Sequence, residues 1–155
     1  MRSRWTPGYS SPITLQLVGP QSWTEVPALL CYDQADPFAV RIAFGDVGDE
    51  NGVVDLEDDG ISWLLSRELL QAGLDGPSGD GDVRLWPAHA ATDVLFLHLR
   101  APSGEALFEL SRAAVAAFLR QTEALVPTGS ESSLLDLDDE LHVLLTNGGP
   151  DSSGR

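Results

Sequence analysis

Lysine is absent from the 155-residue chain and cysteine occurs once, and these absences exclude several kinds of site. The single thiol, Cys31, can form neither an internal disulfide nor a cysteine-based zinc site. It lies in the apolar run ALLCY, which is typical of a small buried side chain rather than a nucleophile. No apolar run approaches the roughly 18 residues that span a bilayer, so we expect no direct membrane insertion. The N-terminal MRSRWTPGYSSP lacks the apolar stretch of a secretory signal, which favours a cytoplasmic protein.

The charge of the chain is strongly one-sided, with 24 acidic and 9 basic residues and a net charge of −15. Every basic residue is an arginine, and the arginines are scattered along the sequence rather than gathered in a stripe. A protein of this charge repels phosphate backbones. We therefore expect neither nucleic acid nor an anionic membrane surface as a partner, unless the fold creates a local basic patch.

Hydrophobic periodicity predicts an α+β fold with a mainly antiparallel sheet of about seven strands. The strands are expected at 13–19, 26–33, 38–44, 61–66, 82–87, 93–100 and 105–111, with room for a short one at 53–56. Helices are expected at 67–74, 111–126 and 134–145, so that two helices end the chain. In the clearest strand, Phe38, Val40, Ile42 and Phe44 share one face. Turn chemistry at QADP and APSG joins neighbouring strands and favours antiparallel pairing.

The helix ends carry recognisable signals. Gly73 is expected to act as the C-cap of the helix at 67–74, and Pro127 is expected to stop the helix at 111–126. The pairs Thr128/Glu131 and Ser133/Asp136 each match a capping box.

A chain of this length suits one core, so a single domain is expected over 12–146. Residues 1–11 are polar and punctuated by proline and glycine, which predicts a flexible lead-in, and 147–155 predict a disordered tail. The segment 45–60 is rich in aspartate and glutamate and predicts an exposed acidic insertion loop. Calcium binding by this loop is the less favoured interpretation.

The stretch GPSGDGDVRLWP, residues 76–87, resembles a ligand loop but fits none of the usual templates. A phosphate-binding loop needs Lys-Ser/Thr after its last glycine, whereas Asp82 follows Gly81 here. The spacing of its carboxylates does not match a calcium loop, and Asp80 replaces the last glycine of a nucleophile elbow. We expect a turn that leads into the strand at 82–87.

No catalytic or metal-binding motif emerges, and no cofactor is expected. His89, His98 and His142 fall in a loop, a strand and a helix, and none has a second histidine at a metal-binding spacing. A Ser/His/Asp triad stays open at this point, because its members meet in space and not in sequence.

Arg84 and Trp86 are the candidate protein-interaction residues. They lie opposite in phase to Val83 and Leu85, and an exposed tryptophan beside an arginine is typical of a protein-binding hot spot. Burial of Trp86 under a helix or under the N-terminal segment is the other interpretation. Trp63 is expected in the core.

Ion pairs are the expected role of several other charged residues. The arginines concerned are Arg41, Arg67 and Arg84, and the nearby carboxylates are Asp33, Asp36 and Asp82.

Five segments in this order resemble the SsgA-like sporulation and cell-division proteins of mycelial actinobacteria: LLCYDQADPFAVRIAF, WLLSRELLQAGL, GPSGDGDVRLWP, GEALFEL and AAFLRQTEALVPTGSES. The resemblance covers roughly residues 13–145. It implies that the residues matching the family motifs are structural: Tyr32, Asp33, Asp36, Pro37, Arg67, Gly73, Gly79, Gly81, Asp82 and Pro127. The segment 46–60 and the N-terminal extension with Trp5 and Tyr9 depart from the family pattern.

The resemblance implies a non-enzymatic protein that acts at division septa during the cell cycle. Expected partners are the tubulin-like GTPase FtsZ and other SsgA-like proteins, with roles in septum-site selection or in remodelling septal and spore-wall peptidoglycan. It also implies a trimer and a fold similar to the whirly single-stranded-DNA-binding proteins. A single-stranded nucleic-acid-binding module is therefore the alternative function, although fold alone does not imply function. An enzyme using scattered aspartates and histidines is the third hypothesis.

Overall fold

The computed structural model describes residues 4–45, 54–55, 61–89 and 92–132. Its main strands are β2 (Tyr9–Val18), β3 (Trp23–Tyr32), β4 (Ala39–Phe44), β6 (Ser62–Ser66), β7 (Val83–Pro87), β8 (Val94–Ala101) and β9 (Gly104–Ser111). The helices are α1 (Arg67–Gly73) and α2 (Arg112–Leu125), and a two-stranded ribbon is formed by β1 (Arg4–Trp5) and β5 (Val54–Asp55). Within these residues, no helix is long and apolar enough to cross a membrane.

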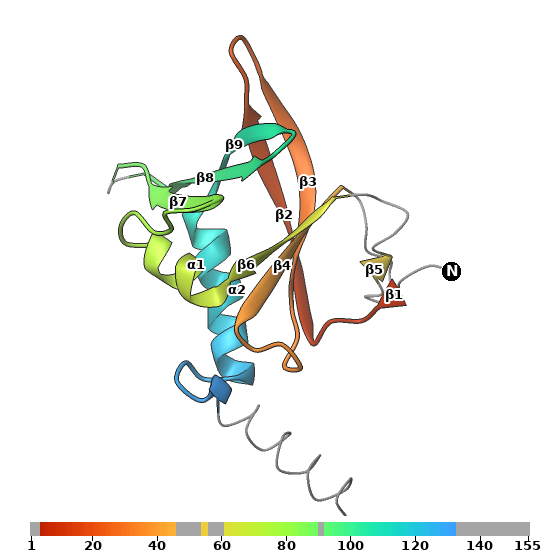
Figure 1. Ribbon diagram of the computed structural model, residues 1–155. Helices are drawn as coiled ribbons and strands as arrows, with labels where there is room; N and C mark the ends of the chain where they lie inside the picture. The colour runs from red at the N-terminus through yellow and green to blue at the C-terminus, as the bar shows by residue number, and fades with distance from the viewer. Residues whose placement is uncertain (1–3, 46–53, 56–60, 90–91, 133–155) are drawn as a thin grey trace, which may run out of the picture.

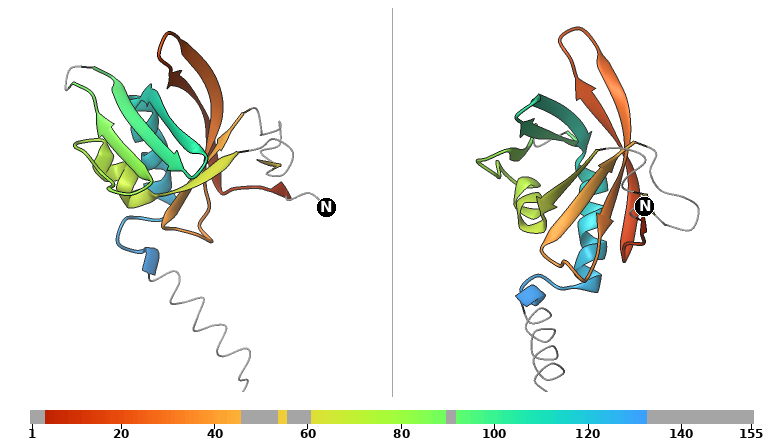
Figure 2. Two further views of the ribbon diagram at one scale, coloured as in Figure 1. Left: turned by 45° about the horizontal axis from the view of Figure 1, so that its top comes forward. Right: turned by 45° about the vertical axis from the view of Figure 1, so that its right-hand side comes forward.

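The seven main strands form one antiparallel sheet in the order β6-β4-β3-β2-β9-β8-β7. The sheet curves around α2, with α1 beside it, and the β2–β3 hairpin extends beyond the rest of the sheet (Figure 1; Figure 2). This arrangement confirms the predicted α+β class and its seven mainly antiparallel strands. The helix predicted at 134–145 and the tail at 147–155 lie outside the described residues, as do all but two residues of the acidic segment 46–60.

Strand β2 begins at Tyr9, inside the segment 1–11 that the sequence assigned to a lead-in. Tyr9 pairs with Tyr32 and Ser10 with Cys31, so the strand is a full partner of β3. The Tyr9 ring also lies 5.4 Å from the ring of Phe118 on α2. The polar run Tyr9–Pro12 hides this strand start from pattern analysis, because hydrophobic alternation begins only at Ile13.

The core lies between the concave face of the sheet and the two helices. Its buried residues include Leu15, Leu30, Val40, Ile42, Leu65, Leu70, Leu85, Leu95, Leu97, Phe108, Val115, Phe118 and Leu119. Trp63 is half-buried and packs against this core. Phe38 was expected on the buried face but is 47 % exposed, because the chain is still turning at Pro37–Phe38 and β4 begins only at Ala39.

Gly73 does not have the predicted role of a left-handed C-cap. It is the last residue of α1 and has no positive φ, and the capping position is taken by Leu74 in a right-handed conformation. A β-carbon on Gly73 would lie 2.4 Å from Cδ2 of Leu85. The residue must therefore be glycine because α1 packs closely against β7.

The N-terminus of α2 is held by two side chains. Ser111 is its N-cap and accepts a hydrogen bond from the Ala114 amide at 3.0 Å. Asp93, which precedes β8, accepts hydrogen bonds from the Ser111 hydroxyl and the Ala113 amide, both at 2.7 Å. These hydrogen bonds lower the pKa of the Asp93 carboxyl below its ordinary value of 3.8, with the Ser111 hydroxyl the largest contributor.

Because folding lowers the pKa of Asp93, the ionised carboxylate stabilises the fold at pH values above the ordinary pKa of 3.8. This contribution is lost as the pH falls through the lowered pKa. Asp93→Asn should therefore lower the urea midpoint of unfolding at pH 7. The difference in midpoint between the variant and the parent chain should become smaller as the pH falls toward about 3. Urea unfolding curves of both chains at several pH values would measure this. A difference in urea midpoint that does not change with pH would show that the charge of Asp93 contributes nothing to the stability of the fold.

Candidate functional site

The stretch at 76–87 forms an open depression with a volume of about 380 Å³ on the outside of β7. Its lining residues are Pro77, Ser78, Gly79, Asp80, Arg84, Leu85 and Trp86. Ser78 and Leu85 donate backbone hydrogen bonds to each other's carbonyl groups, at 2.8 and 2.9 Å, so the loop is fastened to the edge of β7. The described residues contain no group of three or more metal-ligating side chains, here or elsewhere.

Gly79 gives the loop its shape, whereas Gly81 does not. Gly79 has a φ of +88°, and a β-carbon there would lie 2.2 Å from the carbonyl oxygen of Val83. Gly81 has open space around it and no positive φ. As expected from sequence, the stretch turns the chain from α1 into β7.

Trp86 and Arg84 lie on the outer face of β7, opposite the buried side chain of Leu85. Trp86 is half-buried against Phe96, its cross-strand partner on β8, with ring centroids 5.7 Å apart. Trp86 is therefore partly covered by a side chain of the neighbouring strand β8, on the same face of the sheet. Arg84 is exposed and, within the described part of the chain, its guanidinium forms no ion pair, so the pair expected with Asp82 is absent.

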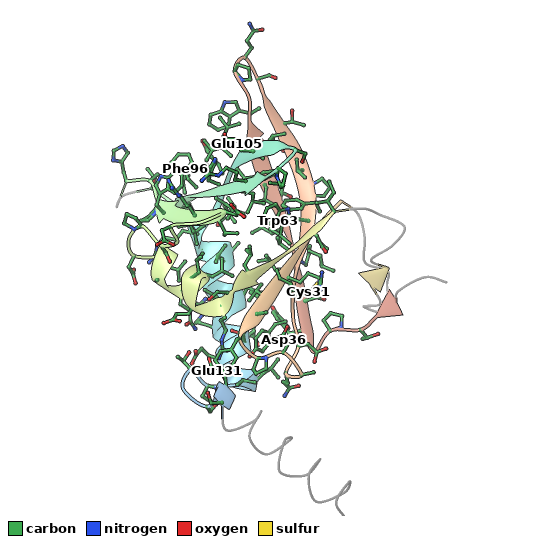
Figure 3. All side chains as sticks on the ribbon, viewed as in Figure 1. Cys31, Asp36, Trp63, Phe96, Glu105 and Glu131 are labelled. Carbon is green, nitrogen blue, oxygen red and sulfur yellow. The ribbon has the colours of Figure 1, made fainter. Side chains whose placement is uncertain are left out.

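The same outer face continues across β8 and β9. His98 lies opposite Arg84, and its Nε2 is 2.6 Å from Oε1 of Glu105, which is labelled in Figure 3. Arg100 is paired in register with Glu105, and Glu109 is paired with Phe96. Acidic side chains therefore stand beside the basic ones, and this face is not a basic patch of the kind that binds nucleic acid.

Phe96 and the His98–Glu105 pair were not identified from sequence. The alternation in 93–100 does place Phe96 and His98 opposite Leu95 and Leu97, which was the available signal. What alternation cannot supply is the register that brings Phe96 against Trp86, because register depends on how distant strands pair.

Arg67 is a buried structural residue, and its partners are distant in sequence. Its side chain is 1 % exposed, and its guanidinium donates hydrogen bonds to the carbonyl groups of Thr122 and Val126, at 3.1 and 2.8 Å. It also donates to Oε2 of Glu131 at 2.6 Å and lies over the Tyr32 ring, 5.1 Å from its centroid. Figure 3 shows Glu131 just beyond α2.

Glu131 serves this cluster instead of the predicted capping box with Thr128. Its Oε1 accepts a hydrogen bond from the Gly129 amide, whereas the Thr128 amide donates to Glu123. The hydrogen bond from Arg67 is the main cause of the lowered pKa of the Glu131 carboxyl. The pair Ser133/Asp136 lies outside the described residues.

The remaining motif residues stabilise turns and strand ends. The Tyr32 hydroxyl donates to the Pro37 carbonyl at 2.9 Å, and Asp33 and Asp36 form the predicted turn through a backbone hydrogen bond of 3.0 Å. The Asp82 carbonyl accepts from the Arg100 amide, and the Pro127 carbonyl accepts from the Ser130 amide.

Cys31 is buried, and burial raises the pKa of its thiol to about 12, so it is a poor nucleophile at neutral pH.

Comparison with known sequences identifies the relatives of this chain. Residues 26–131 match the family model described as Streptomyces sporulation and cell division protein, SsgA. The sporulation-specific cell division protein SsgB of Frankia casuarinae is 41 % identical over 144 residues, which cover 92 % of this chain and 94 % of that protein. SsgB of Streptomyces coelicolor is 41 % identical over 130 residues, which cover 83 % and 88 %.

Two solved structures share the fold. An SsgA-like sporulation-specific cell division protein from Thermobifida fusca superimposes with a TM-score of 0.71 at 32 % identity, covering 91 % of this chain and 95 % of that one. A second, from work on SsgB mutations that correlate with longitudinal cell division during sporulation of Streptomyces coelicolor, gives a TM-score of 0.69 at 36 % identity and covers 86 % and 97 %.

Proposed function

Because this chain belongs to the SsgA family of sporulation and cell division proteins, we propose that it is a non-enzymatic regulator of sporulation-specific division that acts by binding other proteins. The observation that carries the proposal is the nearly full-length match to relatives named sporulation-specific cell division proteins. A protein without chemistry of its own influences division through its surfaces, so the exposed outer face of the sheet is where we look for its activity.

In this proposal the protein acts from the cytoplasm at division septa, as a trimer. Its direct partners are division proteins such as FtsZ or other SsgA-like proteins. Through them it controls the choice of septum site, the recruitment of FtsZ or the remodelling of septal and spore-wall peptidoglycan. The net charge of −15 supports protein partners over nucleic acid, since it repels phosphate.

The surface around Trp86 and Arg84 has the chemistry of a protein anchor. Trp86 presents a flat aromatic ring that Phe96 already holds in place, so little side-chain freedom is lost when a partner covers it. Arg84 lies next to it and can pair with a carboxylate of the partner, since no described carboxylate engages its guanidinium. Tryptophan and arginine are the residue types whose truncation most often weakens protein complexes strongly.

Trp86→Ala and Arg84→Ala should each weaken binding to the division partner by about tenfold or more, which corresponds to about 1.4 kcal/mol. Binding of purified FtsZ and of other family members to the full chain would be measured, together with septal localisation of a fluorescent fusion. Trp23→Ala is the matched control, because Trp23 is 56 % exposed near the tip of the β2–β3 hairpin, away from β7. If neither variant weakens binding to any partner, or if the parent chain binds none and avoids septa, the proposal is wrong.

A further inference from the structure

Among the described residues, no strand pairs with the outer edge of β6. The strand lies at the end of the sheet order, and its described neighbour is β4. The Phe44 amide donates to the Ile61 carbonyl at 2.9 Å, and the Arg67 amide donates to the Phe38 carbonyl at 2.8 Å. In an antiparallel pair, peptide groups point alternately toward and away from the partner strand. The peptide groups of Ser62, Leu64 and Ser66 therefore point away from β4.

The two edges of the sheet differ in their protection. At β7 the loop residue Ser78 occupies the hydrogen-bonding groups of Leu85, and the strand carries Arg84 and ends at Pro87. Loops, charges and prolines of this kind prevent unwanted strand pairing. Strand β6 reads SWLLS, without a charge or a proline, and no described segment pairs with its outer side. Its central residue, Leu64, is 54 % exposed.

A depression with a volume of about 310 Å³ lies beside Leu64 on the outer face of β3, β4 and β6. Cys31, Ala39 and Leu64 contribute apolar surface to it, and Asp33, Asp36 and Arg41 contribute charge. Arg41 lies opposite Leu64 in register and donates to the Ser62 hydroxyl at 2.7 Å. Asp36 is exposed at the end of the depression, near the start of β4 (Figure 3). Such a depression suits a side chain with an apolar stem and a cationic head.

We propose that β6 is a docking edge for an extended basic segment of a partner protein, which adds a strand beside β6 and places an arginine or lysine in this depression. Backbone hydrogen bonds to Ser62, to Leu64 and to the Ser66 amide supply affinity, since the Ser66 carbonyl belongs to the N-cap of α1. The depression supplies specificity. A basic partner matches Asp36 and the net charge of −15. The inference rests on the proposed function only in that the ligand is a protein. The docking edge at β6 is separate from the surface around Trp86.

The test uses the full chain and two synthetic peptides, RTVRVTVR and its acidic counterpart ETVEVTVE. The basic peptide should slow amide hydrogen exchange at Ser62, Leu64 and Ser66, which point outward, and change it little at Trp63 and Leu65, which already face β4. The acidic peptide should have no effect. Leu64→Lys should weaken binding of the basic peptide at least about tenfold, by repelling its charge at the edge. Asp36→Asn should weaken binding of the basic peptide while leaving the backbone edge of β6 unchanged.

Thr14→Lys, an exposed change on the central strand β2, is the matched control and should bind normally. Urea unfolding shows whether Leu64→Lys still folds, and Asp36→Asn tests the proposal independently if it does not. The proposal is overturned if both peptides bind equally, if protection from exchange does not alternate along β6, or if Leu64→Lys and Asp36→Asn both bind the basic peptide normally. Sedimentation showing a dimer that Leu64→Lys dissolves would assign the edge to a second copy instead. Trp86→Ala should leave peptide binding intact, so this surface and the one under "Proposed function" can fail separately.

Discussion

Replacing Arg67 with alanine is expected to lower the free energy of unfolding by about 3–5 kcal/mol, because the variant leaves buried partners of an ion pair without a counterpart. The Val126 carbonyl and Oε2 of Glu131 would lose the Arg67 donor, and the Thr122 carbonyl would keep only the hydrogen bond from the Val126 amide. Oε1 of Glu131 keeps the Gly129 amide, but the carboxylate loses its counter-charge. Since small domains are stable by only about 5–15 kcal/mol, the variant should be partly unfolded at growth temperature. Urea titration followed by tryptophan fluorescence measures the loss.

Arg112→Ala is the matched control for this prediction. Arg112 also forms an ion pair, with Asp75 at 3.0 Å, but the two side chains are 39 % and 84 % exposed. Exposed pairs contribute about 0–1 kcal/mol, so its replacement should change the unfolding free energy little. Equal losses in the two variants would mean that burial of the Arg67 cluster is not what makes it stabilising.

Gly79→Ala is expected to destabilise the fold by about 2–4 kcal/mol, because it combines a left-handed backbone with a steric clash. The β-carbon would meet the Val83 carbonyl oxygen at 2.2 Å, and backbone cannot move aside as a flexible side chain can. Binding through Trp86 should weaken as well, since Gly79 shapes the depression that Trp86 lines.

Gly81→Ala, two residues away, should change the stability of the fold in the opposite direction. Its φ is not positive and nothing lies within 4 Å of the added β-carbon. An alanine at such a position stabilises by up to about 1 kcal/mol, because it restricts the unfolded chain. Thermal unfolding of the two variants side by side measures the contrast, and similar midpoints would show that the loop tolerates a side chain at either position.

The strands could be predicted because their cause is local. Alternating apolar residues set the inner face of β4, β8 and β9, and the turns at QADP and APSG join their neighbours. The outer-face position of Arg84 and Trp86 followed from the same alternation. Its failure at Phe38 also has a local cause, since the turn extends one residue further than the pattern suggests.

The long-range contacts could not be predicted, because nothing near a residue in the sequence names its distant partner. Arg67 was expected to pair with a nearby aspartate, and instead it is bound by Glu131 beyond α2. Gly73 looked like a helix cap, and its actual constraint is Leu85 on a strand that follows the loop. The contact between Trp86 and Phe96 depends in the same way on strand register.

The junction between β2 and β9 also affects how the protein is made. Gln16 pairs with Glu109 and Leu17 with Phe108, so the two halves of the sheet join through residues from opposite ends of the domain. The ribosome releases β2, β3 and β4 well before β9 and α2, and their apolar face has no cover in that interval. Pairings between such distant residues are also slow to form. The chain is therefore most vulnerable to aggregation during its synthesis. Faster translation or a higher temperature should lower the yield of folded protein under conditions that the folded protein itself withstands.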